Sequence, residues 1–113
     1  MQLVAYARIM VEDQMSAYVI VEIRMTDHDA VEAFNKYALK ATELLKEYGA
    51  TVLVFDQAPR VLEGDWRPAA IVVQQYPDMA TVERFHCSDA YAPLRALRAR
   101  FSDNNVIAVA GTL

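Results

Sequence analysis

Cysteine and long apolar runs are scarce in this chain, and each shortage excludes a class of protein. Cys87 is the single cysteine, so no disulfide can form within the chain. We therefore expect a reducing compartment, the cytoplasm, the alternative being a periplasmic protein without disulfides. No apolar run approaches the roughly 18 residues that a membrane-spanning helix needs, and residues 1–9 lack the basic start of a secretory signal. We expect no membrane association.

Basic residues are also outnumbered. The chain of 113 residues has 11 Lys and Arg residues against 15 Asp and Glu residues, which gives a formal net charge of -4. Nucleic-acid-binding domains usually carry a basic stripe, so we expect no nucleic-acid partner. Hydrophobic residues are abundant instead, at 55%, against about 45–50% in ordinary globular proteins. This excess calls for a second buried surface besides the core of one small domain.

The regular pattern begins near Met15. Residues 1–15 read as an N-terminal extension, either a helical turn, an extra strand, a partly ordered tail or an over-long gene model, and residues 16–113 read as one α+β domain. Strands are predicted where β-branched residues cluster, and helices where apolar residues recur at steps of three and four. The predicted order is a strand at 18–23, a helix at 30–48, strands at 51–55 and 70–76, a helix from 78 to 101 with one break, and a strand at 106–110 after a turn at 104–105, with a possible short strand at 60–63.

Short polar residues and glycine mark the ends of these elements. Thr26 or Asp27 is predicted to cap the first helix, and Gly49 to end it in a left-handed conformation. Asp78 is the predicted N-cap of the second helical region, and Ser88 is predicted to break and recap it. The second region should therefore consist of two shorter helices.

This order of elements predicts a ferredoxin-like βαββαβ fold, in which a four-stranded antiparallel sheet carries its helices on one face. Three predicted strands are nevertheless apolar on both faces, at 52–55, 71–73 and 106–109. Monomers rarely leave a large apolar patch in water. A homodimer in which two such sheets face each other is the simplest way to cover the second face.

Three segments carry a resemblance to the bacterial domain-of-unknown-function 1330 family. Residues 16–23 are similar to its opening strand, residues 62–68 (Leu-Glu-Gly-Asp-Trp-Arg-Pro) to its central signature, and residues 85–95 to its second-helix signature, although Asp89 stands where the family often has proline. The resemblance spans about residues 16–111 and implies a dimeric α/β barrel. That superfamily includes cofactor-free monooxygenases, small-ring isomerases, haem-degrading oxygenases and regulatory ligand-binding domains, and the 1330 family itself has no settled reaction.

Two positions are candidates for acid–base chemistry. His86 lies beside the predicted helix break and is a candidate general base, the alternative being a structural or partly exposed histidine. Asp65 and Trp66 stand at the mouth of a strand, where a carboxylate beside an aromatic wall can hold or deprotonate a small polar ligand. The alternative is that Asp65 only closes the turn and Trp66 covers the core or the dimer seam. His28 reads as a solvated residue of a first helical turn.

Other side chains are candidates for binding a substrate. Tyr18, Tyr37 and Tyr91 are predicted to direct hydroxyls between the helices and the sheet, although buried tyrosine hydroxyls usually bond to the backbone. Arg95 is a candidate anchor for a substrate carboxylate, the alternative being a solvated residue paired with acids. Cys87 reads as a small buried apolar residue without an activated thiol.

The resemblance implies chemistry without an organic cofactor, and the residues themselves argue against a metal site. Two isolated histidines with no ligand cluster make a poor metal site, and residues 18–23 lack the asparagine that the resemblance to haem-degrading enzymes would require. The first hypothesis is a cofactor-independent small-molecule enzyme that performs proton transfer or oxygenation on a small organic acid or aromatic. The alternatives are a non-catalytic dimeric ligand-binding or stress-associated protein, and an interaction module that recruits a partner.

Overall fold

The computed structural model describes residues 15–113, and their elements follow the predicted order. They are β1 (Ala17–Met25), α2 (Val31–Glu47), β2 (Thr51–Asp56), β3 (Ala70–Tyr76), α3 (Met79–His86), α4 (Ala92–Ala99) and β4 (Ser102–Ala110). The predicted N-terminal extension lies outside the described residues except for Met15. Within the described range, none of the helices is long and apolar enough to cross a membrane.

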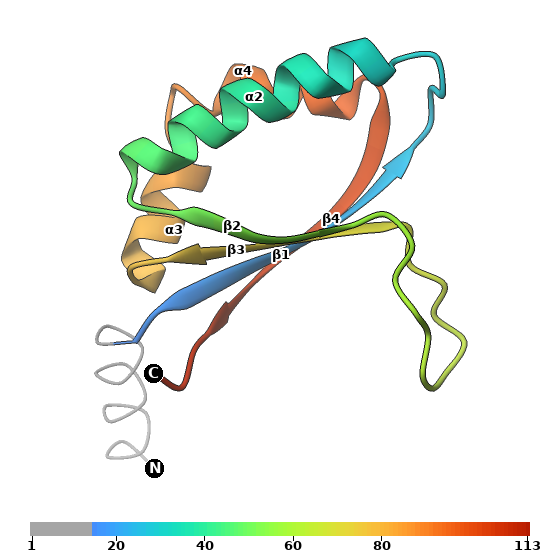
Figure 1. The fold of residues 1–113 in the computed structure, drawn as a ribbon. Coiled ribbons are helices and arrows are strands. Elements are labelled where there is room, and N and C mark those ends of the chain that lie inside the picture. Colours follow the sequence, from blue (N-terminus) through green and yellow to red (C-terminus); the bar gives the residue numbers. More distant parts are fainter. Residues whose placement is uncertain (1–14) are drawn as a thin grey trace.

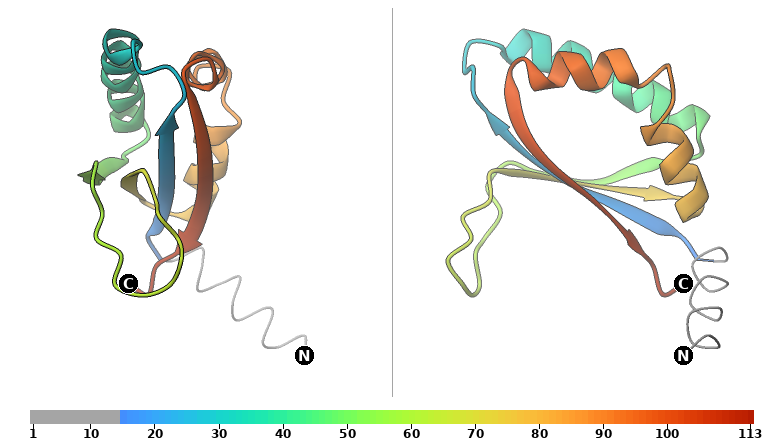
Figure 2. Two further views of the ribbon diagram at one scale, coloured as in Figure 1. Left: turned by 90° about the vertical axis from the view of Figure 1, so that its right-hand side faces the viewer. Right: turned by 180° about the vertical axis from the view of Figure 1, so that it is seen from behind.

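The four strands form one twisted antiparallel sheet in the order β2-β3-β1-β4. This is the order that two interleaved βαβ halves produce. All three described helices lie against one face, which we call the inner face, and no described helix lies over the opposite outer face (Figures 1 and 2). The predicted ferredoxin-like fold class is therefore confirmed for the single chain.

Alternate residues of β1 build the centre of the core. Val19, Val21 and Ile23 are 4–7% exposed and point to the helices. They belong to one buried cluster with Leu45 of α2 and Phe85 of α3. Complete burial of an apolar side chain of this size contributes roughly 1.5–3 kcal/mol. The period of two along β1 thus fixes which face of the sheet receives the helices.

The intervening residues form an apolar row across the outer face. In the cross-strand register Val54 is opposite Val73, Val73 is opposite Ile20, and Ile20 is opposite Ile107. Val54 is 41% exposed and Ile107 is 56% exposed. The sheet is therefore apolar on both sides, as the sequence predicts, while the described helices cover one.

The edge strand β2 contains a β-bulge. Its register shifts between Val52 and Val54, which leaves Leu53 without a partner on β3. In a regular strand, residues three apart point to opposite faces, but the extra residue of a bulge reverses the alternation. Val52 and Phe55 consequently both line the space under α2.

Short polar side chains bond to the main chain at the start and at the end of α3. Asp78 is the N-cap of α3, and its Oδ1 accepts a bond from the main-chain N–H of Thr81 at 2.7 Å. Ser88 Oγ donates to the main-chain oxygen of Phe85 at 2.7 Å and accepts from the N–H of Tyr91 at 3.1 Å. The N-cap at Asp78 and the break at Ser88 are confirmed. The prediction that Ser88 caps the next helix is wrong, because Tyr91 is the N-cap of α4 and makes no side-chain capping bond. The two bonds of Ser88 join the end of α3 to the turn before α4.

The two ends of α2 differ from each other in how well the sequence predicts them. Gly49 follows the helix with a φ of 71°, the left-handed conformation expected of it. At the other end the prediction of a cap at Thr26 or Asp27 is wrong, because the N-cap position is Ala30 and it makes no side-chain capping bond. Asp27 Oδ1 accepts from the N–H of Asp29 at 3.0 Å instead, so its side chain closes a local turn before the helix.

Two further local predictions are wrong. Residues 60–63 form no strand, because the connection 57–69 extends away from the sheet and finds no strand to pair with (Figure 1). Residues 104–105 form no turn but belong to β4, where Asn105 is opposite Glu22. A side-chain bond between these two residues outweighs the local preference of asparagine for turns.

Candidate functional site

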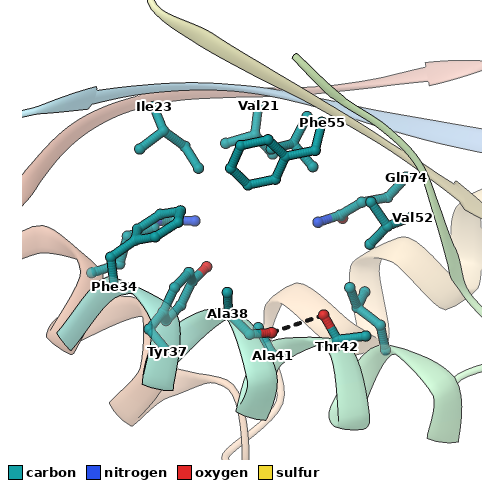
Figure 3. A pocket seen from close by; sticks show the side chains of 13 residues that line it. Val21, Ile23, Phe34, Tyr37, Ala38, Ala41, Thr42, Val52, Phe55 and Gln74 are labelled. Atoms are coloured by element: carbon teal, nitrogen blue, oxygen red, sulfur yellow. Dashed lines mark hydrogen bonds between the residues drawn. The ribbon is translucent and has the colours of Figure 1, made fainter. Parts of the chain in front are cut away.

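Three cavities of the described residues lie between the helices and the sheet, and one of them, about 470 Å³ at the start of α2, lacks the buried polar groups of the other two. The α2 cavity, of about 130 Å³, lies under α2 and is shown in Figure 3. The α3 cavity, of about 220 Å³, lies between α3, the start of α4 and the strands β1, β3 and β4. Val21, Gln74 and Arg98 line both cavities, so the two spaces meet at these three side chains.

Arg98 is the charged group at this junction. It lies in the last turn of α4 and is 6% exposed. Its Nη1 donates to the hydroxyl oxygen of Tyr91 at 2.9 Å, and its Nε is buried without any hydrogen-bond partner. Among the described residues no carboxylate lies within ion-pair distance of it. Since buried charges are normally paired, this guanidinium keeps an unused capacity for an acceptor.

Buried tyrosine hydroxyls surround the junction. Tyr37 and Tyr91 are 8% and 6% exposed, and Tyr76 is 2% exposed with its hydroxyl donating to Gln74 Oε1 at 3.0 Å. Burial raises the pKa of the Tyr37 and Tyr76 hydroxyls, so both stay protonated at neutral pH. Figure 3 shows the Tyr37 hydroxyl and the Gln74 amide directed into the space between α2 and the sheet. The junction is therefore rich in hydrogen-bond donors.

His86 ends α3 and lines the α3 cavity. The centre of its ring lies 5.9 Å from that of Tyr91. Burial lowers the pKa of His86 below its ordinary value of 6.5, and the positive charges of Arg95 and Arg98 lower it further. The imidazole is consequently neutral at neutral pH, and a neutral imidazole can accept a proton.

The structure gathers three predicted site residues at these cavities: Tyr37, Tyr91 and His86. Arg95 is exposed and does not line either cavity. Its Nη1 donates to the main-chain oxygen of His86 at 3.3 Å, so it braces the end of α3. The inward-facing arginine is Arg98, which lies nearly one helical turn further along α4.

The other predicted site residues lie elsewhere. Tyr18 alternates with the core residues of β1 and belongs to the outer face. Asp65 and Trp66 lie in the connection 57–69, where both are exposed, Trp66 by 62%. This connection and α3 lie at opposite ends of the sheet, so Asp65 and His86 do not share a site within one chain (Figure 1).

Sequence reasoning missed three residues of the junction, Arg98, Gln74 and Tyr76. A signal for each was present. Arg98 interrupts the inward stripe of α4 at a helical spacing from Leu94 and Phe101, and Gln74 and Tyr76 occupy inward positions of β3. A polar residue on an otherwise apolar inward stripe is the pattern that identifies such a site.

Residues 15–113 contain no cluster of side chains that could bind a metal ion. No three His, Cys, Asp or Glu side chains of this range gather as metal ligands.

Cys87 was predicted to be buried, and that prediction is wrong, because α3 ends at His86 and Cys87 forms its exposed C-cap. Its neighbours therefore offer it no apolar enclosure.

The outer face holds a second buried charge. Glu22 is 8% exposed, and its Oε2 accepts from the N–H of Ala69 at 2.9 Å and from Arg24 Nη2 at 3.3 Å. Its Oε1 accepts from Asn105 Nδ2 at 3.1 Å. The bond from Ala69, followed by that from Asn105, lowers the pKa of Glu22 below its ordinary value of 4.5. Glu22 thereby fixes the end of the connection 57–69 to the sheet.

Comparison with known proteins supports the fold and leaves the reaction open. The family model described as "Domain of unknown function (DUF1330)" matches residues 16–112. Among solved structures, a protein of unknown function from Rhodopseudomonas palustris is 17% identical, with a TM-score of 0.69, over 95% of this chain and 91% of that one. No curated protein is significantly similar in sequence.

Two further solved structures share the fold. SnoaB from Streptomyces nogalater, described as a cofactor-independent oxygenase, is 10% identical with a TM-score of 0.62, over 86% of this chain and 93% of that one. A dimeric ferredoxin-like protein of unknown function from Thermobifida fusca is 13% identical with a TM-score of 0.59, over 86% of this chain and 92% of that one. At identities this low the structural likeness shows a common fold, but it does not show that the proteins share an activity.

Proposed function

The chain belongs to the DUF1330 family, and we propose that it is an enzyme that transfers a proton on a small organic molecule held between the helices and the sheet, with no metal or organic cofactor. The observation that carries this proposal is the position of His86, a partly buried imidazole with a lowered pKa on the wall of the α3 cavity. Perturbed titratable groups in clefts mark functional sites.

The size and lining of the cavities favour a small substrate with an apolar body. Volumes of about 130 and 220 Å³ are below the roughly 300–1,000 Å³ of sites for drug-sized ligands. His86 would accept the proton from the substrate and return it to another atom. The hydroxyl of Tyr91, held by Arg98, would donate to the oxygen on which negative charge develops.

Oxygenation is the second candidate reaction. The structural likeness to SnoaB favours it, because that protein is described as a cofactor-independent oxygenase. Loss of a proton from an aromatic substrate would activate the substrate in either reaction, and His86 would accept that proton in both.

The test of the enzymatic proposal is hydrogen–deuterium exchange of substrate protons. Small aromatic and oxo acids, such as phenylpyruvate, would be incubated with the protein in D₂O, and loss of the acidic C–H signal followed by proton NMR. We expect His86→Ala to slow exchange by about 10²-fold or more. His28→Ala is the matched histidine control, because His28 is exposed and lines neither the α2 cavity nor the α3 cavity, but only the third cavity at the start of α2.

The pH profile adds a second measurement. Because the pKa of His86 is lowered from 6.5, the exchange rate should rise with pH below 6.5 and be constant above it. Exchange that His86→Ala leaves unchanged would contradict the role of His86. Binding of several acids without exchange of any would favour the non-catalytic ligand-binding alternative.

We also propose that two copies pair through their outer faces in the cytoplasm. The apolar row of Ile20, Val54, Val73 and Ile107 supports this pairing, as does the dimeric description of the relative from Thermobifida fusca. Sedimentation at micromolar concentration should give twice the chain mass of 12.7 kDa, and Ile107→Lys should halve it. A wild-type particle of one chain would contradict the pairing.

A further inference from the structure

The junction of the two cavities contains a charge without a counter-charge. The side chain of Arg98 is 6% exposed, and its Nε has no hydrogen-bond partner among residues 15–113. More than about 90% of buried polar groups in folded proteins are bonded. Leaving one unpaired costs about 1–3 kcal/mol, and more for a charged group. The unpaired group therefore destabilises the folded protein, and it lies where the two cavities meet.

Compensation from within the described chain is weak. The hydroxyl of Tyr91 is a neutral acceptor, and the C-terminal dipole of α4 supplies only a fraction of a charge. Glu83 is the one carboxylate among the described residues that line either cavity, and it is exposed and forms no ion pair with Arg98. The missing acceptor must therefore come from outside the described residues.

From this arrangement we propose that Arg98 anchors the carboxylate of a small monocarboxylic acid at the junction of the two cavities. The proposal rests on the interior site proposed above and names its substrate class. A guanidinium offers a planar pair of donors that matches the two oxygens of a carboxylate. Arg98 interacts with the Tyr91 and Tyr37 hydroxyls, and its unpartnered Nε remains available for such a contact.

The neighbours of Arg98 suit a carboxylate as well. The Tyr37 hydroxyl keeps its proton because burial raises its pKa, and Gln74 directs its amide into the same space (Figure 3). The Tyr91 hydroxyl lies within hydrogen-bond distance of Arg98. The larger α3 cavity offers room for an apolar body beside His86. Positive charge dominates locally, since Arg95 and Arg98 together lower the pKa of His86 in a protein of net charge -4.

The experiment compares acids with their neutral amides. Acetate, isobutyrate and benzoate would be titrated against acetamide, isobutyramide and benzamide, with affinities measured by calorimetry and by chemical shifts. At least one acid should bind the full-length wild-type protein about tenfold or more tightly than its amide. Arg98→Met should remove this preference and leave amide binding unchanged.

Matched variants separate the anchor from general charge effects. Arg100→Met removes an exposed arginine just beyond the same helix and should leave acid binding unchanged. Arg98→Lys keeps the charge without the planar fork and should retain part of the preference. If Arg98→Met does not fold, thermal unfolding of the wild type still decides, because a bound acid should raise the Tm and its amide should not.

The outcomes also distinguish this inference from the proposed enzyme. Equal binding of acid and amide, no binding of any of the three acids, or an unchanged preference in Arg98→Met would overturn the anchor. Acid binding that depends on Arg98, with no proton exchange on any acid, would support the anchor and contradict the enzyme. Exchange that depends on His86 and is unaffected by Arg98→Met would do the reverse.

Discussion

Glu22 and Arg98 are both buried charged residues, but they lie on opposite faces of the same sheet and differ in their partners. Glu22 accepts a main-chain bond from Ala69, a side-chain bond from Asn105 and a third bond from Arg24. Arg98 has only neutral hydrogen-bond partners among the described residues, and an unpaired Nε. A buried charge that its own chain satisfies contributes to folding, whereas one left unsatisfied marks a site for something the chain does not contain.

The two faces of the sheet differ in the same way. Among the described residues the outer face exposes apolar side chains, and its charged residue is fully bonded, which is the basis for the pairing proposed above. The inner face is covered by helices, and its charged residue lacks a counter-charge among the described residues, which is the basis for the anion proposed above. One sheet can therefore serve assembly on one side and chemistry on the other.

The sharpest test of this comparison is the stability of two variants. Glu22→Ala leaves the N–H of Ala69 and the amide of Asn105 without an acceptor, and we expect it to lower the free energy of unfolding by about 2–3 kcal/mol. Arg98→Met removes an uncompensated buried charge, and we expect a change within about 1 kcal/mol of zero or a gain in stability. Urea unfolding measures both.

Acid should act on the two faces unequally. The folded-state pKa of Glu22 is lowered, so its contribution is complete above its ordinary pKa of 4.5 and is lost as the pH falls through the lower folded-state value. Asp78 behaves in the same way. The wild type should therefore lose more stability than Glu22→Gln between pH 6 and pH 2, while Arg98→Met should follow the wild type. Parallel curves for the wild type and Glu22→Gln would contradict the assignment.

A smaller effect is expected where α3 meets α4. Ser88→Ala removes two hydrogen bonds, one that Ser88 Oγ donates to the main-chain oxygen of Phe85 and one that it accepts from the N–H of Tyr91. We expect the free energy of unfolding to fall by about 1 kcal/mol. Because this joint positions both His86 and Tyr91, the same variant should also slow proton exchange. Reduced stability with an unchanged exchange rate would show that the bonds of Ser88 do not position the site.

The smallest effect should come from a charge pair on the surface. Lys36 Nζ and Glu32 Oε1 are 3.7 Å apart, and both side chains are largely exposed. Glu32→Ala should change the free energy of unfolding by less than about 0.5 kcal/mol. It is the matched control for Glu22→Ala, since each variant removes one glutamate. A similar loss in both variants would mean that net charge, and not the bonds of Glu22, sets stability.

Local signals predicted the fold well where a residue acts on its own neighbours. Gly49 adopts the left-handed conformation that ends α2, and Asp78 caps α3 through a residue three positions away. The prediction failed at Asn105, whose side chain binds Glu22 across 83 positions of sequence. The conformational preference of a residue for its own neighbours cannot predict a hydrogen bond between residues so far apart in the sequence.

The site was harder to predict than the fold because it depends on the rotation of one helix. The sequence places Arg95 and Arg98 on neighbouring positions of α4, and the packing of Leu94 and Phe101 decides that Arg98 turns inward. The tyrosines gathered as expected because a large aromatic ring favours burial wherever it lies on an inner face. Trp66 is the single tryptophan of the chain, but the sequence did not indicate whether it is buried, and its side chain is exposed.

The bulge in β2 has a consequence for how copies of this chain can associate. An edge strand with a regular row of free main-chain groups is a template onto which another polypeptide can add and polymerise. The unpaired Leu53 breaks that row near the middle of β2. Open-ended growth along the edge at β2 is thereby hindered, whereas the face-to-face pairing proposed above would close after two subunits.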